Sequence, residues 1–353
     1  MNRFLSKKHA ALKPYVPGEQ PRGEVVVKLN TNESPFPPSP SVLAAISEAA
    51  RHLNLYSDPQ GTELRAALAT YHGVSPANIS LGNGSDEPLA FAFNAFGDAE
   101  HPFAFPDVTY GFYPVFAAAN GVPYTEIPLD ANLEINVADY INRGCNIAIA
   151  NPNAPTGIAL PLVEIERIIA SNPDHVVVID EAYVDFGGET AMPLVAKYDN
   201  LLVVRTFSKS RNLAGGRLGY AVGSEDLIGA LETIRNSFNP YNVNSLTLAA
   251  GVAALSENAY YEDCWAQVAE LRETLIGLLR MQDFVVTESK TNFVFARHPS
   301  FSGVELQKAL RERSFLVRNL GPDRIRDWLR ITIGSQEDMS AMYNAICEIM
   351  HNY

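Results

Sequence analysis

Hydrophobic and polar positions change their period several times along this chain, and these changes outline its elements. Four short apolar runs bounded by turn residues predict buried strands. They lie at 103–106, 146–150, 176–179 and 201–204. Apolar residues return at helical spacing before the first of these runs, as at 42–49 behind a serine, and again after it in the segment that ends near Asn120. The alternation of strands and helices from about 78 to 222 predicts an α/β domain with a mostly parallel sheet.

A different order of elements follows this alternation. Residues 226–281 have a helical pattern that breaks at 239–242 and, more weakly, at 257–258. Beyond it, a helix-like segment at 303–313 lies among short apolar runs, which predicts an α+β unit. These runs are 284–286, 292–296, 315–318 and 328–334.

The N-terminal segment is rich in proline and glycine around one strand-like run at 25–29. Such a composition is typical of an arm that lies on another part of the molecule. We therefore expect residues 1–40 to form an arm that joins a small domain. A large domain over 41–255 and a small C-terminal domain over 256–353 complete the predicted division.

Charge and cysteine content narrow the classes of function. The chain carries 40 acidic and 27 basic residues, a formal net charge of −13, so nonspecific binding of nucleic acid is not expected. No apolar run approaches the length of a membrane span and the N-terminus lacks a secretory pattern, which predicts a cytoplasmic protein with no membrane contact. The three cysteines are far apart, so we expect neither a disulfide framework nor a metal site.

The polar stretch 206–220 follows the strand-like run 201–204 and contains the main candidate for chemistry. Lys209 stands where the strand ends, and Thr206, Ser208 and Arg217 offer hydroxyl and guanidinium groups that suit a phosphate. Glycines in the same stretch allow close backbone approach. This combination suits a lysine Schiff base to a phosphorylated aldehyde cofactor, although a lone lysine in a polar loop is more often a surface residue.

A second candidate for phosphate binding lies at a helix start. Gly84, Ser85 and Asp86 follow a strand-like run and open the apolar-periodic segment 89–96. The free N–H groups and the positive dipole end of a helix attract an anion. The turn matches neither the dinucleotide fingerprint nor the P-loop, and by itself it could be a plain helix cap.

Two charged residues stand in otherwise apolar strands. Asp180 directly follows the run 176–179, where a carboxylate at the end of a central strand can pair with a protonated pyridine nitrogen or can cap a helix. Arg330 alternates with apolar residues in 328–334. A charge seldom points into such a strand unless it is paired, so Arg330 is a candidate for an anionic ligand or for an internal salt bridge.

The segment Thr206–Lys209, followed eight positions later by Arg217, resembles the pyridoxal-phosphate attachment segment of class I and II aminotransferases. It is most similar to the histidinol-phosphate aminotransferase family, although Asn212 stands where that family has a small residue. The order of motifs extends the resemblance from Asn30 to Gly334. The resemblance implies the aminotransferase type I fold, pyridoxal 5′-phosphate as cofactor and Lys209 as its attachment site.

The resemblance assigns further roles around the cofactor. It implies that Asn32 lines the substrate entrance and that Tyr110 stacks on the pyridine ring. Tyr56 would reach the cofactor phosphate of a neighbouring subunit, which implies a homodimer with shared active sites. Tyr183 would donate to the ring oxygen. Asp180 would hold the ring nitrogen protonated.

One motif departs from the family pattern. The segment 151–157 is similar to the family's N-P-N-x-P-T-G, but Ala154 stands where many relatives have an asparagine that contacts the ring oxygen. We therefore assign this contact to Asn153. For the substrate, the resemblance implies that Arg330 binds the α-carboxylate. It also implies that Arg318, with Tyr15 from the arm, reaches a distal phosphate.

The expected function follows from this resemblance. It is a histidinol-phosphate:2-oxoglutarate aminotransferase of histidine biosynthesis, acting on a small-molecule amino donor and a 2-oxo acid acceptor. An aromatic amino-acid aminotransferase and a threonine-phosphate decarboxylase share the fold and remain alternatives. A non-catalytic regulator that keeps the fold for effector binding is an alternative of another class, but no added DNA-binding domain fits before Asn30.

Overall fold

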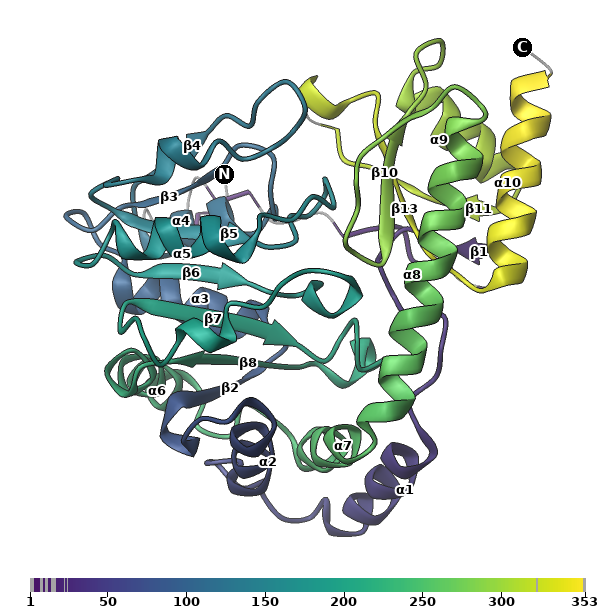
Figure 1. The fold of residues 1–353 in the computed structure, drawn as a ribbon. Coiled ribbons are helices and arrows are strands. Elements are labelled where there is room, and N and C mark those ends of the chain that lie inside the picture. The colour runs from purple at the N-terminus through teal and green to yellow at the C-terminus, as the bar shows by residue number, and fades with distance from the viewer. Residues whose placement is uncertain are drawn as a thin grey trace.

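The computed structural model describes residues 3–6, 9, 12–13, 17–21, 23, 25–321 and 323–351. Within these residues the chain builds two principal sheets, which lie on the left and right of Figure 1. The large sheet has seven strands. In spatial order they are β2 (Ile79–Asn83), β8 (Leu218–Gly223), β7 (Leu201–Thr206), β6 (Val177–Asp180), β5 (Asn146–Ala150), β3 (Phe103–Pro106) and β4 (Tyr124–Ile127).

The large sheet is mostly parallel, as the sequence predicts. β7, β6, β5, β3 and β4 run parallel, whereas β8 is antiparallel to both β7 and β2. The carboxyl ends of parallel strands meet at one edge of a sheet, and ligands bind outside that edge in open α/β sheets. We therefore expect a ligand site at the carboxyl ends of β5, β6 and β7.

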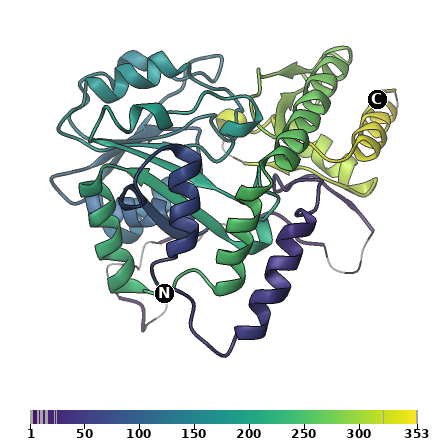
Figure 2. The same cartoon turned by 60° about the horizontal axis from the view of Figure 1, so that its bottom comes forward.

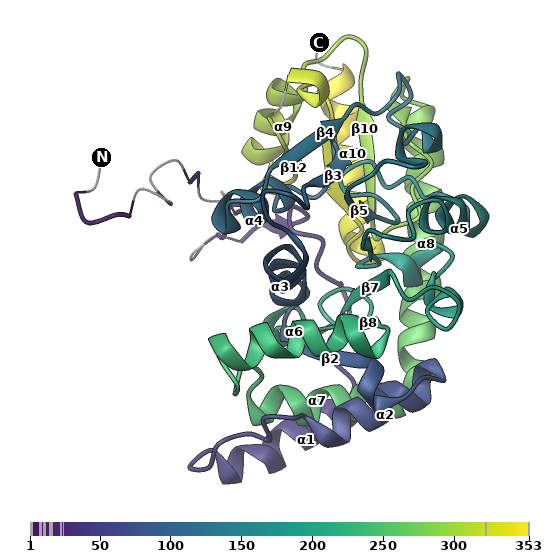
Figure 3. The same ribbon diagram turned by 90° about the vertical axis from the view of Figure 1, so that its left-hand side faces the viewer.

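Helices cover both faces of the large sheet, which Figure 3 shows nearly edge-on. One face carries α3 (Asp86–Phe96), α4 (Tyr113–Asn120) and α6 (Glu225–Phe238). The other carries α2 (Thr62–His72), α5 (Leu162–Ala170) and α7 (Ser245–Ser256). Val178 packs into the first core and Val177 into the second. Burial on both faces explains why these strands are continuously apolar in sequence.

The small sheet contains four strands within the described residues, β12 (Arg318–Asn319), β13 (Leu329–Thr332), β10 (Phe293–Arg297) and β9 (Val285–Val286). Its core is shared with α8 (Asn258–Arg280), α9 (Gly303–Glu312) and α10 (Gln336–His351). The arm reaches this part of the molecule, because β1 (Val27–Lys28) pairs with β11 (Phe315–Leu316). The domain boundaries at 40 and 255 stay predictions.

A helical layer closes the far end of the large sheet. α1 (Pro40–Ala49) packs against α7, and Figure 2 turns this end toward the viewer. Long α8 then runs from the neighbourhood of α7 to β9, so one helix joins the two sheets. In the described part of the chain no helix has the length and the apolar character needed to cross a membrane.

Two element predictions differ from the structure. The strand expected at 25–29 shortens to β1, because only two residues pair with β11. β2 extends through Gly82 and Asn83, directly up to the turn at Gly84 that the sequence suggested. These residues continue the ladder with β8, and Gly82 gives room to the ring of Pro88.

Close backbone approach at Gly219 fixes the start of α3 against β8. A Cβ atom at this position would overlap the backbone nitrogen of Ser85 and the carbonyl carbon of Gly84. Neither atom is the end of a flexible side chain. The turn that precedes α3 would therefore have to move if residue 219 carried a side chain.

We expect Gly219→Ala to lower the free energy of unfolding by roughly 1–3 kcal/mol, because overpacking against backbone has no side-chain relief. The matched control is Gly229→Ala in α6, where an added Cβ meets nothing within 4 Å. That change should be neutral or stabilise the protein by up to about 1 kcal/mol. Urea unfolding of both variants makes the comparison, and equal stabilities would contradict it.

Candidate active site

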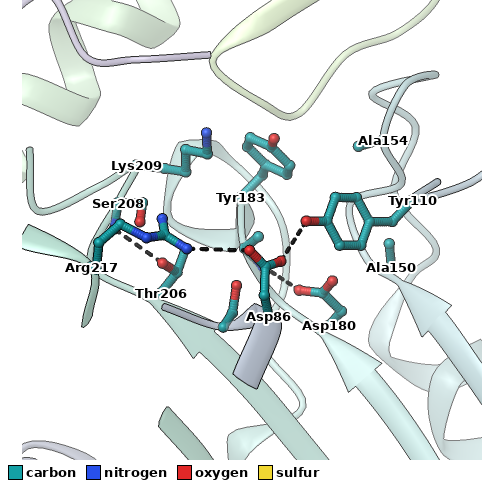
Figure 4. A pocket seen from close by; sticks show the side chains of 12 residues that line it. Asp86, Tyr110, Ala150, Ala154, Asp180, Tyr183, Thr206, Ser208, Lys209 and Arg217 are labelled. Atoms are coloured by element: carbon teal, nitrogen blue, oxygen red, sulfur yellow. Dashed lines mark hydrogen bonds and ion pairs between the residues drawn. The ribbon is translucent and has the colours of Figure 1, made fainter. Parts of the chain in front are cut away.

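A pocket opens at the carboxyl edge of the large sheet, where β5, β6 and β7 end (Figure 4). Segments that are far apart in sequence meet there. The lining residues are Ser85, Asp86, Tyr110, Ala150, Ala154, Asp180, Ala182, Tyr183, Thr206, Ser208, Lys209 and Arg217. Most of the sequence candidates for cofactor binding are therefore gathered around one space.

Lys209 reaches this space from the loop after β7. Its Nζ donates a hydrogen bond to the carbonyl oxygen of Thr31, 3.2 Å away, and lies 5.8 Å from the ring centroid of Tyr183. Burial lowers the pKa of Lys209 to about 8, and the nearby Arg330 cation acts in the same direction. Near physiological pH this amine is therefore neutral in a larger fraction of molecules than an ordinary lysine is, and the neutral form can act as a nucleophile or a base.

Asp180 lies at the end of β6 and is only 4% exposed. Its Oδ2 accepts a hydrogen bond from the hydroxyl of Tyr113 at 3.1 Å, and its Oδ1 accepts one from the backbone N–H of Ala182 at 3.2 Å. Burial raises the pKa of Asp180 to about 7, because these two donors offset only part of the lost hydration. A cation placed in the pocket would restore the ionised form.

Tyr183 is held by the arm. Asn32 Nδ2 donates to the Tyr183 hydroxyl at 2.8 Å, so the phenolic proton is free to point to another acceptor. Asn32 itself has a left-handed φ of 56° and is fixed by Thr332, whose Oγ1 accepts from the Asn32 N–H at 3.0 Å. Burial also raises the pKa of Tyr183, so the phenol keeps its proton.

Donors for an anion surround the part of the pocket next to α3. The hydroxyl of Ser208 is buried and makes no hydrogen bond within the described part of the chain. Ser85 stands at the N-cap of α3, which leaves first-turn N–H groups without helical partners. Arg217 Nη2 donates a hydrogen bond to Asp86 Oδ2 at 3.2 Å, and the Tyr110 hydroxyl donates one to Asp86 Oδ1 at 2.5 Å (Figure 4). A phosphate fits these donors, and it would give the Ser208 hydroxyl a partner.

Two arginines lie side by side on the small sheet. Arg318 of β12 and Arg330 of β13 are register partners in an antiparallel pair, so their side chains share one face. Arg330 Nη2 donates to the carbonyl of Asn30 at 3.2 Å, and Arg318 Nη1 donates to the carbonyl of Pro17 at 3.3 Å. Two guanidinium groups on one face are groups that can bind a carboxylate or a phosphate.

Some predicted residues do not line the pocket of their own chain. Tyr56 is 85% exposed and stacks on Tyr241, with ring centroids 4.7 Å apart. The side chain of Asn153 bonds to the Val108 carbonyl and to the Thr156 hydroxyl, both at 3.0 Å, while neighbouring Ala154 faces the pocket. Gly84 lies directly behind Arg217 with a φ of 75°. Tyr15 lies outside the described residues.

Sequence reasoning missed several contributors to the site. Tyr113 contacts Asp180 from α4, and the Thr31 carbonyl contacts Lys209 from the arm. Ala150 and Ala182 keep the floor of the pocket small. Tyr113 belongs to an aromatic cluster whose pattern indicates only a hydrophobic core. The Thr31 carbonyl is a backbone group, which every residue has, so the sequence cannot indicate it. No group of metal-binding side chains occurs among the residues that the structure describes.

Comparison with known proteins places this geometry in a family. The family model "Aminotransferase class I and II" matches residues 24–346. The chain is 50% identical over 350 residues to "Histidinol-phosphate aminotransferase 1" of Bradyrhizobium diazoefficiens, covering 99% of this chain and 100% of the relative. It is also 50% identical over 354 residues to "Histidinol-phosphate aminotransferase 2" of Dechloromonas aromatica, covering 99% of each.

A solved structure supports the same placement. The histidinol-phosphate aminotransferase from Sinorhizobium meliloti, crystallised in complex with pyridoxal-5′-phosphate, superposes with a TM-score of 0.85. Its sequence is 25% identical, and the match covers 94% of this chain and 92% of that chain. The aminotransferase type I fold predicted from the sequence is confirmed.

The depressed pKa of Lys209 gives a test that needs no ligand. Reductive methylation should modify Lys209 with a pH midpoint near 8, against about 10.4 for ordinary exposed lysines. Arg330→Met removes a nearby positive charge and should raise this midpoint. Peptide mass spectrometry across a pH series measures both, with the exposed Lys308 as the internal reference. A midpoint for Lys209 equal to that of Lys308 would contradict the burial argument.

Proposed function

Because the chain belongs to the class I and II aminotransferase family, we propose that it is a pyridoxal-phosphate-dependent histidinol-phosphate:2-oxoglutarate aminotransferase of histidine biosynthesis. The observation that carries the substrate class is the pair Arg318 and Arg330, which lie opposite each other on neighbouring strands of the small sheet. The 50% identity to histidinol-phosphate aminotransferases, which extends over 99% of the chain, supports the same substrate over aromatic amino acids or threonine phosphate.

The residues of the pocket fit pyridoxal phosphate. Its phosphate group would be held by Arg217, Thr206, Ser208 and the start of α3, and the Ser208 hydroxyl, which has no hydrogen-bond partner among the described residues, supports this placement. Tyr110, which lines the pocket, would cover one side of the ring. When bound, the cofactor supplies an electron sink that stabilises the charge left when the substrate α-carbon loses a proton. The residues of the chain provide orientation and proton transfer.

Lys209 has two tasks in this proposal. Its amine would attach the cofactor covalently, and the same amine, when it is free, would move the proton of the substrate α-carbon. A pKa of about 8 supports both tasks, because the neutral amine is then more populated near neutral pH than it is for an ordinary lysine. The carbonyl of Thr31 gives the free amine a defined direction.

Asp180 holds a proton on the ring nitrogen. Its carboxylate is buried and would be half-protonated near pH 7 by itself, since burial raises its pKa to about 7. A cationic ring nitrogen lowers that pKa again, so the ionised carboxylate and the protonated nitrogen stabilise each other. Tyr113 and the Ala182 N–H fix the orientation of the carboxylate for this contact.

Tyr183 would donate a hydrogen bond to the ring oxygen, because Asn32 already occupies an acceptor site on its hydroxyl and the phenolic proton points elsewhere. The family asparagine at this point is replaced by Ala154. We assign Asn153 a supporting role, since its hydrogen bonds to Val108 and Thr156 shape the turn that presents Ala154. Asn32 likewise acts on the substrate entrance through Tyr183 and Thr332.

The two arginines take different anions. Arg330 would bind the α-carboxylate of glutamate. It lies close enough to Lys209 for its positive charge to lower the pKa of that amine, which supports this role. Arg318, with Tyr15 of the arm, binds the phosphate of histidinol phosphate. An arginine binds a carboxylate or a phosphate through two parallel hydrogen bonds.

The test of the function is a comparison of kcat/KM for histidinol phosphate, phenylalanine, tyrosine and threonine phosphate on one preparation. Arg318→Ala should lower kcat/KM for histidinol phosphate by about 10–100-fold, the loss of one charge-assisted contact, and affect phenylalanine less. Arg330→Ala should impair glutamate most. The control is Arg280→Ala, which removes an exposed arginine paired with Glu288.

Other outcomes would redirect the assignment. Preference for phenylalanine or tyrosine would indicate an aromatic aminotransferase, and release of carbon dioxide from threonine phosphate would indicate a decarboxylase. A chain that shows no borohydride-sensitive yellow absorption, after incubation with pyridoxal phosphate, would contradict the attachment at Lys209 and favour a non-catalytic regulator.

The proposal includes a cytoplasmic homodimer. Exposed apolar side chains gather around Tyr56, a pattern that marks an association surface. They include Leu53, Leu55, Phe238 and Tyr241, which are 58%, 64%, 76% and 43% exposed. A second copy of the chain would cover them and bring Tyr56 to the partner's phosphate site. The three cysteines are free, as is usual in a reducing compartment.

A shared site predicts complementation between inactive variants. Mixing Lys209→Ala chains with Tyr56→Ala chains should restore up to about a quarter of the parent activity, because half of the dimers then carry one complete site out of two. Tyr124→Phe, on an exposed tyrosine of β4, is the control and should stay active. Activity that stays absent after verified exchange of subunits would show that Tyr56 serves its own chain.

A further inference from the structure

A buried arginine lies behind the pocket, on the opposite face of the large sheet. Arg205 of β7 is 6% exposed; its Nε lies 3.7 Å from Oε2 of Glu181, and its Nη2 forms an ion pair with Oδ1 of Asp185. Successive side chains of a strand point to opposite faces. Arg205 therefore faces away from the pocket that its neighbour Thr206 lines. The catalytic roles assigned above do not use it.

The two carboxylates flank Tyr183 in sequence. Glu181 lies two residues before it and Asp185 two residues after it, in the short 3₁₀ helix Val184–Phe186. The segment turns tightly, because the N–H of Val184 donates to the carbonyl of Glu181 at 3.3 Å. The Arg205 guanidinium thus contacts both ends of this turn, and Tyr183 in its middle lines the pocket.

The Glu181 end of this turn is also fixed by other contacts. Glu181 is 2% exposed and also accepts hydrogen bonds from Thr190 Oγ1 at 2.7 Å and from the Ala191 N–H at 2.5 Å. A buried carboxylate that loses its cation is left uncompensated. Without Arg205 the turn would have to admit water, take up a proton or move.

Neighbouring groups do not replace Arg205. His72 bonds to Tyr220, the register partner of Arg205, but burial lowers the pKa of His72 to about 3, so it adds no charge. Arg211 lies over the ring of Tyr71 and donates to Asn258 Oδ1. Within the described residues, Arg205 is the cation in ion-pair contact with both Glu181 and Asp185.

We propose that Arg205 is a positioning residue for the aminotransferase reaction, acting through the turn that carries Tyr183. Its ion pairs with Glu181 and Asp185 hold both ends of the turn on the far face of the sheet. They thereby fix the Tyr183 phenol in the pocket beside Lys209. Asp180, the residue before Glu181, is held by the same contact. The inference rests on the proposed function only for the identity of the cofactor that Tyr183 and Asp180 face.

The experiment compares Arg205→Met with Arg205→Lys and with Arg65→Met. Arg65 is the matched control, a largely buried arginine on α2 that lies 3.6 Å from Glu232 and does not line the pocket. The readouts are the melting temperature, kcat and KM, and the pH midpoint of the visible absorption of the bound cofactor. That midpoint reports the proton on the bond to Lys209 and responds to the Tyr183 hydroxyl.

We expect Arg205→Met to shift the spectral midpoint by about half a pH unit or more. Its kcat should fall about 10-fold or more while KM changes less than about 3-fold, as for a misplaced catalytic group. Arg205→Lys keeps the charge and should recover part of both effects. Arg65→Met should lower the melting temperature while leaving the midpoint and kcat at parent values.

A spectral midpoint and kcat equal to those of the parent in folded Arg205→Met would overturn the inference. If that variant does not fold, Asp185→Asn takes its place, since it keeps the side-chain volume and weakens one side of the clamp; an unchanged midpoint there overturns the inference as well. Failure of the proposed function has a different signature, because the parent protein itself would then form no visible absorption with pyridoxal phosphate.

Discussion

A carboxylate that has been removed from water has to be neutralised or paired, and Asp180 imposes this requirement on the centre of the pocket. Two hydrogen bonds, from Tyr113 and Ala182, do not replace its hydration, so its pKa rises to about 7. Burial moves Lys209 in the opposite direction, to about 8. An acid and an amine that begin far apart are thereby brought to within about one pH unit of each other. The other lining residues supply the anion donors and the acceptors around these two groups.

The position of these groups could be predicted because strand ends carry strong sequence signals. The run 176–179 and the run 201–204 are both continuously apolar, and each is followed at once by polar residues. Parallel strands place such followers at the same edge, which is why Asp180, Thr206 and Ser208 face one space. The mostly parallel sheet and the break between α6 and α7 were predictable for the same reason, since each depends on local pattern.

Contacts between distant segments were not predictable from pattern. Tyr113 lies 67 residues before Asp180, and a buried tyrosine in an aromatic cluster gives no sign of its partner. The Thr31 carbonyl and the commitment of Asn153 to Val108 depend on backbone positions that only the assembled fold defines. The same holds for Asn32, whose left-handed backbone presents its amide to Tyr183 rather than to solvent. Arg205 carries no sequence signal of its own after the run 201–204, and its two carboxylate partners come close to it only because β6 and β7 lie side by side.

Asn32 also has a mechanical consequence. Its amide holds the Tyr183 phenol in the large sheet's pocket, while its backbone is tied to Thr332, two residues beyond Arg330 on β13. Any rotation of the small sheet away from the large one must break one of these bonds or drag the phenol with it. Asn32 of the arm therefore connects β13, the strand that carries Arg330, to the Tyr183 hydroxyl that lines the pocket. A displacement of β13, and with it of Arg330, would therefore also displace the Tyr183 hydroxyl.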